Sequence, residues 1–340
     1  MIITRSSFLR GAIASSMLIP AAALGAEGAF QSDAASGNIH PWTQIPRAGG
    51  GPLRFAVIGD NTGLSRPGVF DQAMIQLNWL QPDFVISVGD LIEGYTEDRV
   101  KIAGQWTAVE NSVAKLGCPF IYAPGNHDID NAETLDAWRE RRGATYHSFT
   151  YKGALFLVLN SEDPPTPMSA KLAGQFYSMV DLMQSDPDKA EKIIDAYMAS
   201  DTSGQKGEYS TLEVVKFSDA QLGWIRDVLA RHPKPQWTFV ILHKPAWKMQ
   251  SPDFAKIQAM LAGRPHTVFA GHTHYFTHEV FDGHDYINMA TTGGIRQKFG
   301  PGTMDHNMLV TMSANGPLYA NTRFNGLMNV AGETGQVRAY

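Results

Sequence analysis

The stretch that decides the fold is RFAVIGD at residues 54–60, where a short apolar run ends in a glycine and an aspartate. The pattern returns at residues 84–90, which read FVISVGD. Short runs of β-branched and aromatic residues that stop at glycine are typical of strands, and runs without polar alternation are typical of strands buried on both faces. We therefore expect two buried strands that deliver Asp60 and Asp90 at their carboxyl ends.

Similar runs continue along the chain and alternate with helix-like stretches. Further strand-like runs lie at residues 119–128, 154–162, 238–245, 266–274 and 286–294. Apolar positions at helical spacing lie at residues 70–80, 100–117, 135–143 and 217–232. The last of these helices is predicted to begin after Ser218, with Gln221 three positions further on. Residues 307–326 read as a hairpin or as edge strands. Strands that alternate with helices predict an α/β sandwich.

The chain divides into a leader, a connecting segment, one large domain and a tail. We predict an export signal at residues 1–26, a linker at 27–50, the domain at 51–325 and a C-terminal tail at 326–340. Residues 163–217 interrupt the strand–helix alternation, and we predict that they form a helical insertion between two strands.

The first residues have the features of an export signal. Arg5 and Arg10 lie in MIITRSSFLRG without an acidic residue, and the apolar, small-residue stretch AIASSMLIPAAALGA follows. TRSSFLR resembles the twin-arginine export motif, although Ser6 stands where that motif has its second arginine. We therefore expect an exported protein, periplasmic or secreted; a plain N-terminal anchor helix is the alternative. No other stretch is apolar and long enough to predict a membrane span.

Composition excludes several classes of function. The 340 residues carry a formal net charge of −5, so a nucleic-acid groove, which needs a basic patch, is not expected. The single cysteine, Cys118, cannot form an internal disulfide or a zinc cluster of thiols. A small anionic substrate remains compatible with this charge, because a bound metal ion reverses the local field.

Polar side chains that bind metals stand at the end of each buried run. In chain order they are Asp60, Asp90, Asn126 with His127 and Asp128, His243, and His272 with His274. Ligand sites of α/β sheets lie outside the carboxyl ends of the strands, so we expect these side chains to converge. In an extended segment, His272 and His274 would project to the same side. The sequence thus predicts a metal site.

The residue types limit the choice of metal. Imidazole together with carboxylate suits Mn, Fe, Zn, Ni or Co and does not suit Ca or Mg. Five or six ligands exceed what one tetrahedral ion needs, so two ions that share a carboxylate use them better. Such pairs of ions clamp the attacking and leaving oxygens in a phosphoryl displacement.

The ordered motifs GD (59–60), GDLIE (89–93), GNHD (125–128), His243 and GHTH (271–274) resemble those of the calcineurin-like metallophosphoesterase superfamily. The resemblance spans residues 51 to about 315. It implies a four-layer α/β/β/α sandwich with a two-metal site at the carboxyl ends of the strands.

The resemblance also implies a role for each residue. Asp60 and His274 would bind the first metal, Asp90 would bridge the two, and the second would be bound by Asn126, His243 and His272. His127 would be the proton donor or phosphate-contacting histidine, and Asp128 would orient it. An imidazole titrates near neutral pH, which suits such a donor.

Thr62 departs from the family pattern, which commonly has histidine two residues after the first aspartate. The first metal would then lack one imidazole. Water could fill the position, Glu93 or His306 could replace the imidazole, or the first site could bind weakly. A threonine hydroxyl is a poor metal ligand. We favour water or a weakened site.

The function implied is an exported hydrolase of phosphate monoesters or diesters, in which a metal-bridging hydroxide attacks phosphorus. Its substrate would be a small phosphorylated molecule. The alternative is a metal- or phosphate-binding protein of the same fold with weakened catalysis, and Thr62 is the sequence feature in its favour.

Overall fold

Two mixed β-sheets form the centre of the molecule. In the computed structural model, residues 28–34, 38–47, 49–199, 213–249, 251–296, 300–331 and 333–335 are described. The larger sheet has seven strands in the order β1 (Gln31–Ser32), β5 (His147–Tyr151), β6 (Ala154–Val158), β7 (Trp237–Ile241), β8 (His266–Ala270), β10 (His284–Asn288), β9 (Thr277–Phe281). The smaller has five, β12 (Gly316–Arg323), β11 (His306–Ser313), β2 (Arg54–Ile58), β3 (Phe84–Ser87), β4 (Phe120–Ile121).

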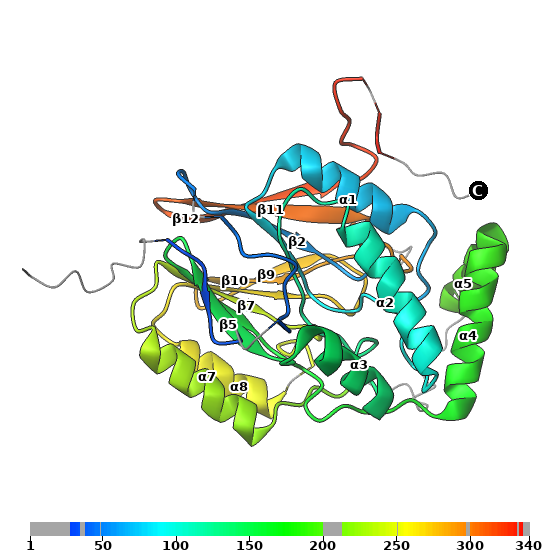
Figure 1. Ribbon diagram of the computed structural model, residues 1–340, viewed down its shortest axis with the longest axis horizontal. Helices are drawn as coiled ribbons and strands as arrows, with labels where there is room; N and C mark the ends of the chain where they lie inside the picture. Colours follow the sequence, from blue (N-terminus) through cyan, green and yellow to red (C-terminus); the bar gives the residue numbers. More distant parts are fainter. Residues whose placement is uncertain are drawn as a thin grey trace, which may run out of the picture.

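Helices cover the outer face of each sheet. The five-stranded sheet packs against α1 (Val69–Leu80), α2 (Arg99–Val113) and α3 (Ala132–Arg142). The seven-stranded sheet packs against α7 (Asp219–Arg231) and α8 (Pro252–Leu261). In Figure 1, α1 lies above the stacked sheets, and α7 and α8 lie below them. The predicted four-layer α/β/β/α sandwich is confirmed.

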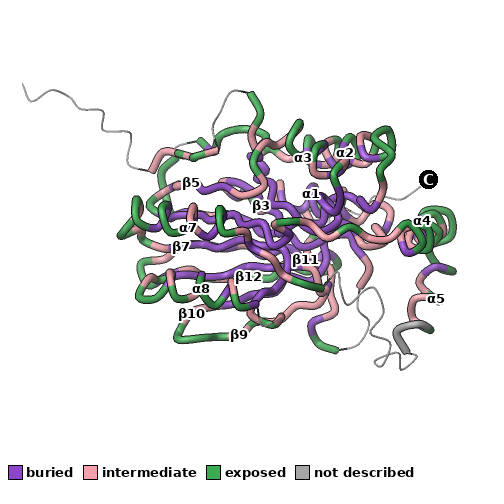
Figure 2. Tube along the Cα trace, turned by 90° about the horizontal axis from the view of Figure 1, so that it is seen from below, coloured by how far each residue is buried: buried purple, intermediate pink, exposed green. Residues whose placement is uncertain are grey.

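The apolar runs fill the space between the two sheets. Phe55 and Phe84 of the smaller sheet meet Phe156 and Phe239 of the larger one, with ring centroids 4.8–5.4 Å apart across the interface. All four rings are fully buried. Burial of one such side chain contributes about 1.5–3 kcal/mol to folding. Figure 2 shows the same division, with buried strands inside and exposed helix faces outside.

Parallel strands bring the predicted polar residues to one end of the sandwich. β2, β3 and β4 run parallel in the smaller sheet, and β6, β7, β8 and β10 run parallel in the larger. Within each sheet, the segments after neighbouring strands are hydrogen-bonded: the Asn61 N–H donates to the Asp90 carbonyl at 3.0 Å in the smaller sheet, and the Gly271 N–H donates to the His243 carbonyl at 2.8 Å in the larger one.

Local signals account for most of the helices. The Ser218 hydroxyl accepts a hydrogen bond from the Gln221 N–H at 3.2 Å, so the predicted helix start at Ser218 is confirmed. The hairpin expected over residues 307–326 is confirmed as β11 and β12, which pair antiparallel. Helix α8 and strand β9 were not predicted. β9 reads THEVF and is largely exposed, so no buried run marks it.

The insertion and the linker lie partly against the domain. The insertion contains α4 (Ala170–Ser185) and α5 (Pro187–Ala199), which lie beside α2 at one end of the sandwich in Figure 1. Within the predicted linker, β1 pairs with β5 and Trp42 is buried in the core, so this segment is not a free connection. The predicted export signal at residues 1–26 lies outside the described residues. Over the described part of the chain, no helix is long and apolar enough to cross a membrane.

Candidate metal centre

Two buried carboxylates form the middle of the site. Asp60 Oδ2 lies 3.1 Å from His274 Nε2, and Asp60 Oδ1 is buried without a hydrogen-bond partner. Asp90 Oδ2 lies 3.0 Å from His243 Nε2, and Asp90 Oδ1 accepts the His127 N–H at 2.9 Å. Among the described residues, both aspartates form ion pairs with histidines and with neither lysine nor arginine. Buried carboxylates require a compensating cation, so this arrangement suits metal ions.

The GHTH segment is a turn. His272 and His274 have φ angles of 70° and 52°, in the left-handed region. The prediction of an extended segment is therefore wrong. The turn closes on Asp60: its Oδ2 accepts the His272 N–H at 2.9 Å and also contacts the His274 ring. One carboxylate oxygen thus holds both ends of the motif, and this is what places the two imidazoles.

Main-chain carbonyls orient three of the four histidine rings. Nδ1 lies 3.0 Å from the Val88 carbonyl in His243, 2.7 Å from the Ile295 carbonyl in His274 and 2.8 Å from the Glu93 carbonyl in His127. A carbonyl accepts only from a protonated nitrogen, so Nδ1 carries the proton in these rings. The Nε2 lone pair is then available to a metal, which is the usual arrangement of metal-binding histidines.

Three of the predicted ligands come within coordinating distance of one another. Among the described residues, one ligand atom each of Asp90, His243 and His272 lies within 4.8 Å of the other two. Asn126 adds a fourth group: its Nδ2 donates to the Tyr95 hydroxyl at 2.5 Å, while its Oδ1 is buried without a partner. An amide held in this way has an oxygen free for a cation. The donor set therefore fits the second metal that the sequence predicts.

The electrostatics of the metal-free site also call for positive charge. Burial alone would lower the pKa of His243, but the Asp90 carboxylate raises it to about 9. Burial alone would raise the pKa of Asp90, but His243 and His127 lower it well below its usual range. Without metal, the carboxylates of Asp90 and Asp60 favour the protonated form of His243. A divalent cation bound to Asp90 would compensate that carboxylate instead, and His243 would release its extra proton.

Asp128 has a role different from the predicted one. Its carboxylate accepts main-chain N–H bonds from Asp90, Leu91 and Gly125 at 2.9 Å and from Ile92 at 3.2 Å. The ring of His127 is oriented by the Glu93 carbonyl instead. Asp128 therefore ties the loop of Asp90 to the loop of Asn126. Burial, together with the nearby charge of Asp90, raises its pKa to about 7.

The structure removes two of the substitutes considered for the imidazole missing at Thr62. Glu93 accepts the main-chain N–H of Ser65 at 2.7 Å and of Leu64 at 3.2 Å. His306 accepts the Ala290 N–H at Nε2, at 3.0 Å, and its Nδ1 lies 2.8 Å from Asn321 Oδ1. Thr62 itself is fully buried, and its hydroxyl has no partner. Water or a weakened site remains the expectation.

At two glycines of the site, the neighbouring carboxylate leaves no room for a side chain. A Cβ added to Gly125 would lie 2.2 Å from Asp90 Oδ1, and one added to Gly271 would lie 2.3 Å from Asp60 Oδ1. We expect Gly125→Ala and Gly271→Ala to displace these carboxylates and to lower metal content below half of the wild-type value, measured by metal analysis of the purified proteins. The matched control is Gly104→Ala in α2, where the added Cβ meets nothing within 4 Å. That variant should keep its metal and gain about 0.5–1 kcal/mol of stability. Normal metal content in both site variants would contradict the expectation.

Several residues near the site carry no signal in the sequence. Tyr95 packs on the His127 ring, with centroids 4.4 Å apart, and is not part of a motif. Glu213 Oε2 lies 3.0 Å from His272 Nε2, although it is far from GHTH in the chain. Lys244, directly after His243, is fully buried and pairs with Glu162 at 2.9 Å. Trp247 donates from its indole nitrogen to Glu279 at 2.6 Å.

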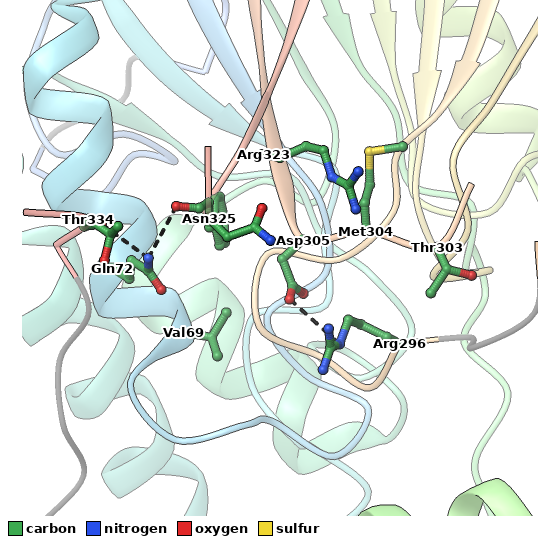
Figure 3. Close-up of a pocket in the computed structure, with 10 residues that line it drawn as sticks. Val69, Gln72, Arg296, Thr303, Met304, Asp305, Arg323, Asn325 and Thr334 are labelled. Atoms are coloured by element: carbon green, nitrogen blue, oxygen red, sulfur yellow. Dashed lines mark hydrogen bonds and ion pairs between the residues drawn. The ribbon is translucent and has the colours of Figure 1, made fainter. Parts of the chain in front are cut away.

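Two cavities lie near the loops of the site. One, of about 340 Å³, is lined in part by Asn61, Thr62 and Glu93. The other, of about 280 Å³, contains none of the predicted metal ligands, and Figure 3 shows Arg296 beside Asp305 in it. Asp305 also accepts from Arg66, so its carboxylate compensates two cations. The second cavity therefore shares no residue with the predicted metal site.

A family model covers the part of the chain that carries these residues. The family model of the calcineurin-like phosphoesterases matches residues 53–276, which include every predicted metal ligand. Human serine/threonine-protein phosphatase CPPED1 is 35% identical over 103 residues, which are 27% of this chain and 31% of the relative. The zebrafish (Danio rerio) protein of the same name is 32% identical over 101 residues, with the same coverage. The matched part thus spans about a third of the length of these relatives.

Solved structures share the fold at low sequence identity. A dimetal phosphatase from Danio rerio superposes with a TM-score of 0.50 at 14% identity, over 80% of this chain and 99% of that one. Purple acid phosphatase PPD1 from yellow lupin gives a TM-score of 0.50 at 13% identity, over 82% of this chain and 52% of that one. With the ordered motifs, the layered sheets and a matched family model that covers most of the domain, the chain belongs to the calcineurin-like phosphoesterase family.

Proposed function

We propose that this protein hydrolyses esters of phosphoric acid with two transition-metal ions, drawn from Mn, Fe, Zn, Ni and Co. The observation that carries the proposal is the convergence of buried ligands from both sheets, including the unpartnered oxygens of Asp60 and Asn126. Asp60, His274 and the shared Asp90 would hold the first ion. Asp90, Asn126, His243 and His272 would hold the second. When bound, such ions lower the pKa of water and draw negative charge from phosphoryl oxygens.

His127 is the group of this chain best placed to handle the leaving oxygen. Its Nε2 lies 3.8 Å from Asp90 Oδ2, next to the proposed bridging carboxylate. Its Nδ1 is held by the Glu93 carbonyl, so the ring cannot turn without losing that bond. Nε2 is therefore the atom that would hold the proton for a departing alkoxide, the usual task of a general acid.

Helix α4 of the insertion forms one wall beside His127. Phe176 packs against the His127 ring, with centroids 5.5 Å apart, and the Tyr177 hydroxyl donates to the Gly94 carbonyl. Gln184 donates to the Ser65 carbonyl at 2.8 Å. We propose that this wall limits the substrate to a small phosphorylated molecule, either a monoester or a diester.

The test is turnover of p-nitrophenyl phosphate and bis-p-nitrophenyl phosphate by chelated protein, with each metal added back. The proposal expects no turnover without metal and recovery with at least one of the five metals. Preference for one substrate would separate monoesters from diesters. A phosphoserine peptide is a third substrate, because the relatives are named serine/threonine-protein phosphatases. Metal binding without any turnover would favour the alternative, a binding protein with weakened catalysis.

Thr62 allows a direct test of the first metal site. We expect Thr62→His to tighten the weaker of the two metal affinities tenfold or more, about 1.4 kcal/mol, because it supplies an imidazole where a hydroxyl has no partner. Thr62→Val is the matched control and should leave both affinities unchanged. Isothermal titration of metal-free protein measures both. A loss of affinity in Thr62→Val would show that the hydroxyl is itself a ligand.

We also propose that the protein is exported, on the basis of its basic and then apolar first residues. Fractionation of cells that express the full chain, followed by N-terminal sequencing of the mature form, tests this. Recovery outside the cytoplasm with residues 1–26 removed supports a signal, and an intact N-terminus in the membrane fraction supports an anchor helix.

A further inference from the structure

His272 differs from the other histidines of the centre in what holds the ring nitrogen that faces away from the other candidate ligands. The rings of His127, His243 and His274 are held by main-chain carbonyls. His272 Nε2 instead lies 3.0 Å from a carboxylate oxygen of Glu213. A carbonyl is fixed by the backbone of the sheet, whereas this carboxylate belongs to the last residues of the insertion. One metal ligand therefore depends on a side chain from outside the sandwich.

The two nitrogens of His272 are clearly assigned by their neighbours. Nδ1 lies 3.2 Å from His243 Nε2 and faces the other ligands of the second metal. Nε2 faces Glu213, which as a carboxylate only accepts hydrogen bonds. The proton therefore belongs on Nε2, and the lone pair of Nδ1 is directed to the centre. This is the tautomer that a ligand bound through Nδ1 needs.

The segment directly after Glu213 is anchored to the loops that follow β6 and β7. The Lys244 ammonium, directly after His243, lies 3.1 Å from the Val214 carbonyl and 2.9 Å from Glu162. Two residues after Val214, the Lys216 N–H donates to the Ser161 carbonyl at 2.9 Å. A buried lysine and a strand-like bridge thus fix the backbone next to Glu213. The carboxylate reaches His272 from a defined position, although its side chain is 56% exposed.

We propose that Glu213 is a positioning residue for the second metal: it fixes the tautomer and the orientation of His272. The proposal rests on the proposed function in one respect, that the centre binds a second cation. Carboxylates that accept from a metal-binding histidine raise its basicity, and their loss typically weakens metal affinity 10–100-fold. The insertion then contributes to metal binding as well as to the wall beside His127.

The experiment measures metal binding and needs no turnover. Metal-free wild type, Glu213→Ala and Glu213→Gln are titrated with Co(II), and binding is followed by heat and by visible absorption of the bound ion. We expect Glu213→Ala to weaken one of two cobalt sites 10–100-fold and to keep two ions per chain at saturation. Glu213→Gln, whose amide oxygen still accepts from Nε2, should recover most of the affinity.

Asp285→Asn is the matched control. Asp285 Oδ1 lies 2.7 Å from Nε2 of His278; this pair on β9 and β10 is exposed at His278, half-buried at Asp285, and contains no predicted ligand. This variant should bind cobalt like the wild type. Thermal unfolding of each metal-free variant checks that the fold is intact.

The results separate two kinds of failure. Equal cobalt affinity in wild type and Glu213→Ala would overturn the role of Glu213 and leave the metal centre intact. A saturating content of one ion in Glu213→Ala would also overturn it, because Glu213 would then be a ligand itself. If the wild-type protein bound neither cobalt nor any of the other four metals, the metal centre would be overturned, and the role of Glu213 with it.

Discussion

Asp90→Asn is expected to lower turnover by about 10³-fold and to remove at least one of the two metals. Asp90 touches both halves of the centre, through His243 at 3.0 Å and the His127 N–H at 2.9 Å. Asparagine keeps the shape of the side chain and tolerates the φ of 56° at this position. The variant therefore removes the charge that two cations would share, and it should still fold. Turnover of p-nitrophenyl phosphate and metal content per chain measure the two effects.

The control lies at the other end of the same strand. Asp83 precedes β3, accepts the Arg54 N–H at 2.9 Å and pairs with Lys152 at 2.9 Å. Asp83→Asn should change activity less than twofold and cost about 1 kcal/mol of stability or less, because its ion pair is partly exposed. If Asp90→Asn kept full activity and both metals, Asp90 would not be the bridging ligand and the assignment of the centre would have to be rebuilt.

His127→Ala is expected to lower turnover 10²–10⁴-fold while both metals stay bound. Its side chain is placed beside the ligands: Nδ1 is held by the Glu93 carbonyl, and only Nε2 is near Asp90. The loss should depend on the leaving group. Phenyl phosphate, whose phenoxide is a poorer leaving group than p-nitrophenoxide, should lose much more rate than p-nitrophenyl phosphate, which needs little help from an acid. Metal analysis of the same preparations checks that binding is unchanged.

His278→Ala serves as the control for histidine removal, because His278 is exposed and pairs with Asp285 away from the centre. Its activity on both substrates should match the wild type. An equal loss of rate on good and poor leaving groups in His127→Ala would exclude proton donation. His127 would then act by contact with the phosphate, the other role that the family resemblance implies.

The sequence predicted the layers and the place where the candidate ligands gather because both depend on local patterns. Buried runs ending in GD, GNHD and GHTH mark strands together with their polar ends. Parallel pairing places Asp60 beside Asp90, and stacking of the two sheets brings His243 to them. The family model and the shared fold confirm the superfamily and the sandwich. The individual roles of the site residues remain predictions, and the variants above test them.

What the sequence did not predict depends on loop conformation and on distant contacts. Asp128 was expected beside the His127 ring, but the left-handed turn at Asp90 directs main-chain N–H groups to its carboxylate. Tyr95 and Glu213 act on Asn126 and His272 from separate loops, and no motif connects such pairs along the chain. Strand β9 lies at the sheet edge and is mostly exposed, so its residues carry no buried pattern.

The candidate ligands come from both sheets, which share no strand. Asp60, Asp90 and Asn126 follow strands of the smaller sheet, and His243, His272 and His274 follow strands of the larger one. Bound cations would thus join the two halves of the sandwich as a cross-link. A chain with Cys118 as its one cysteine has no internal disulfide for that purpose. At a free metal concentration one hundred times Kd, each ion would add about 2.7 kcal/mol to folding stability, so scarcity of metal would loosen the whole domain as well as silence its chemistry.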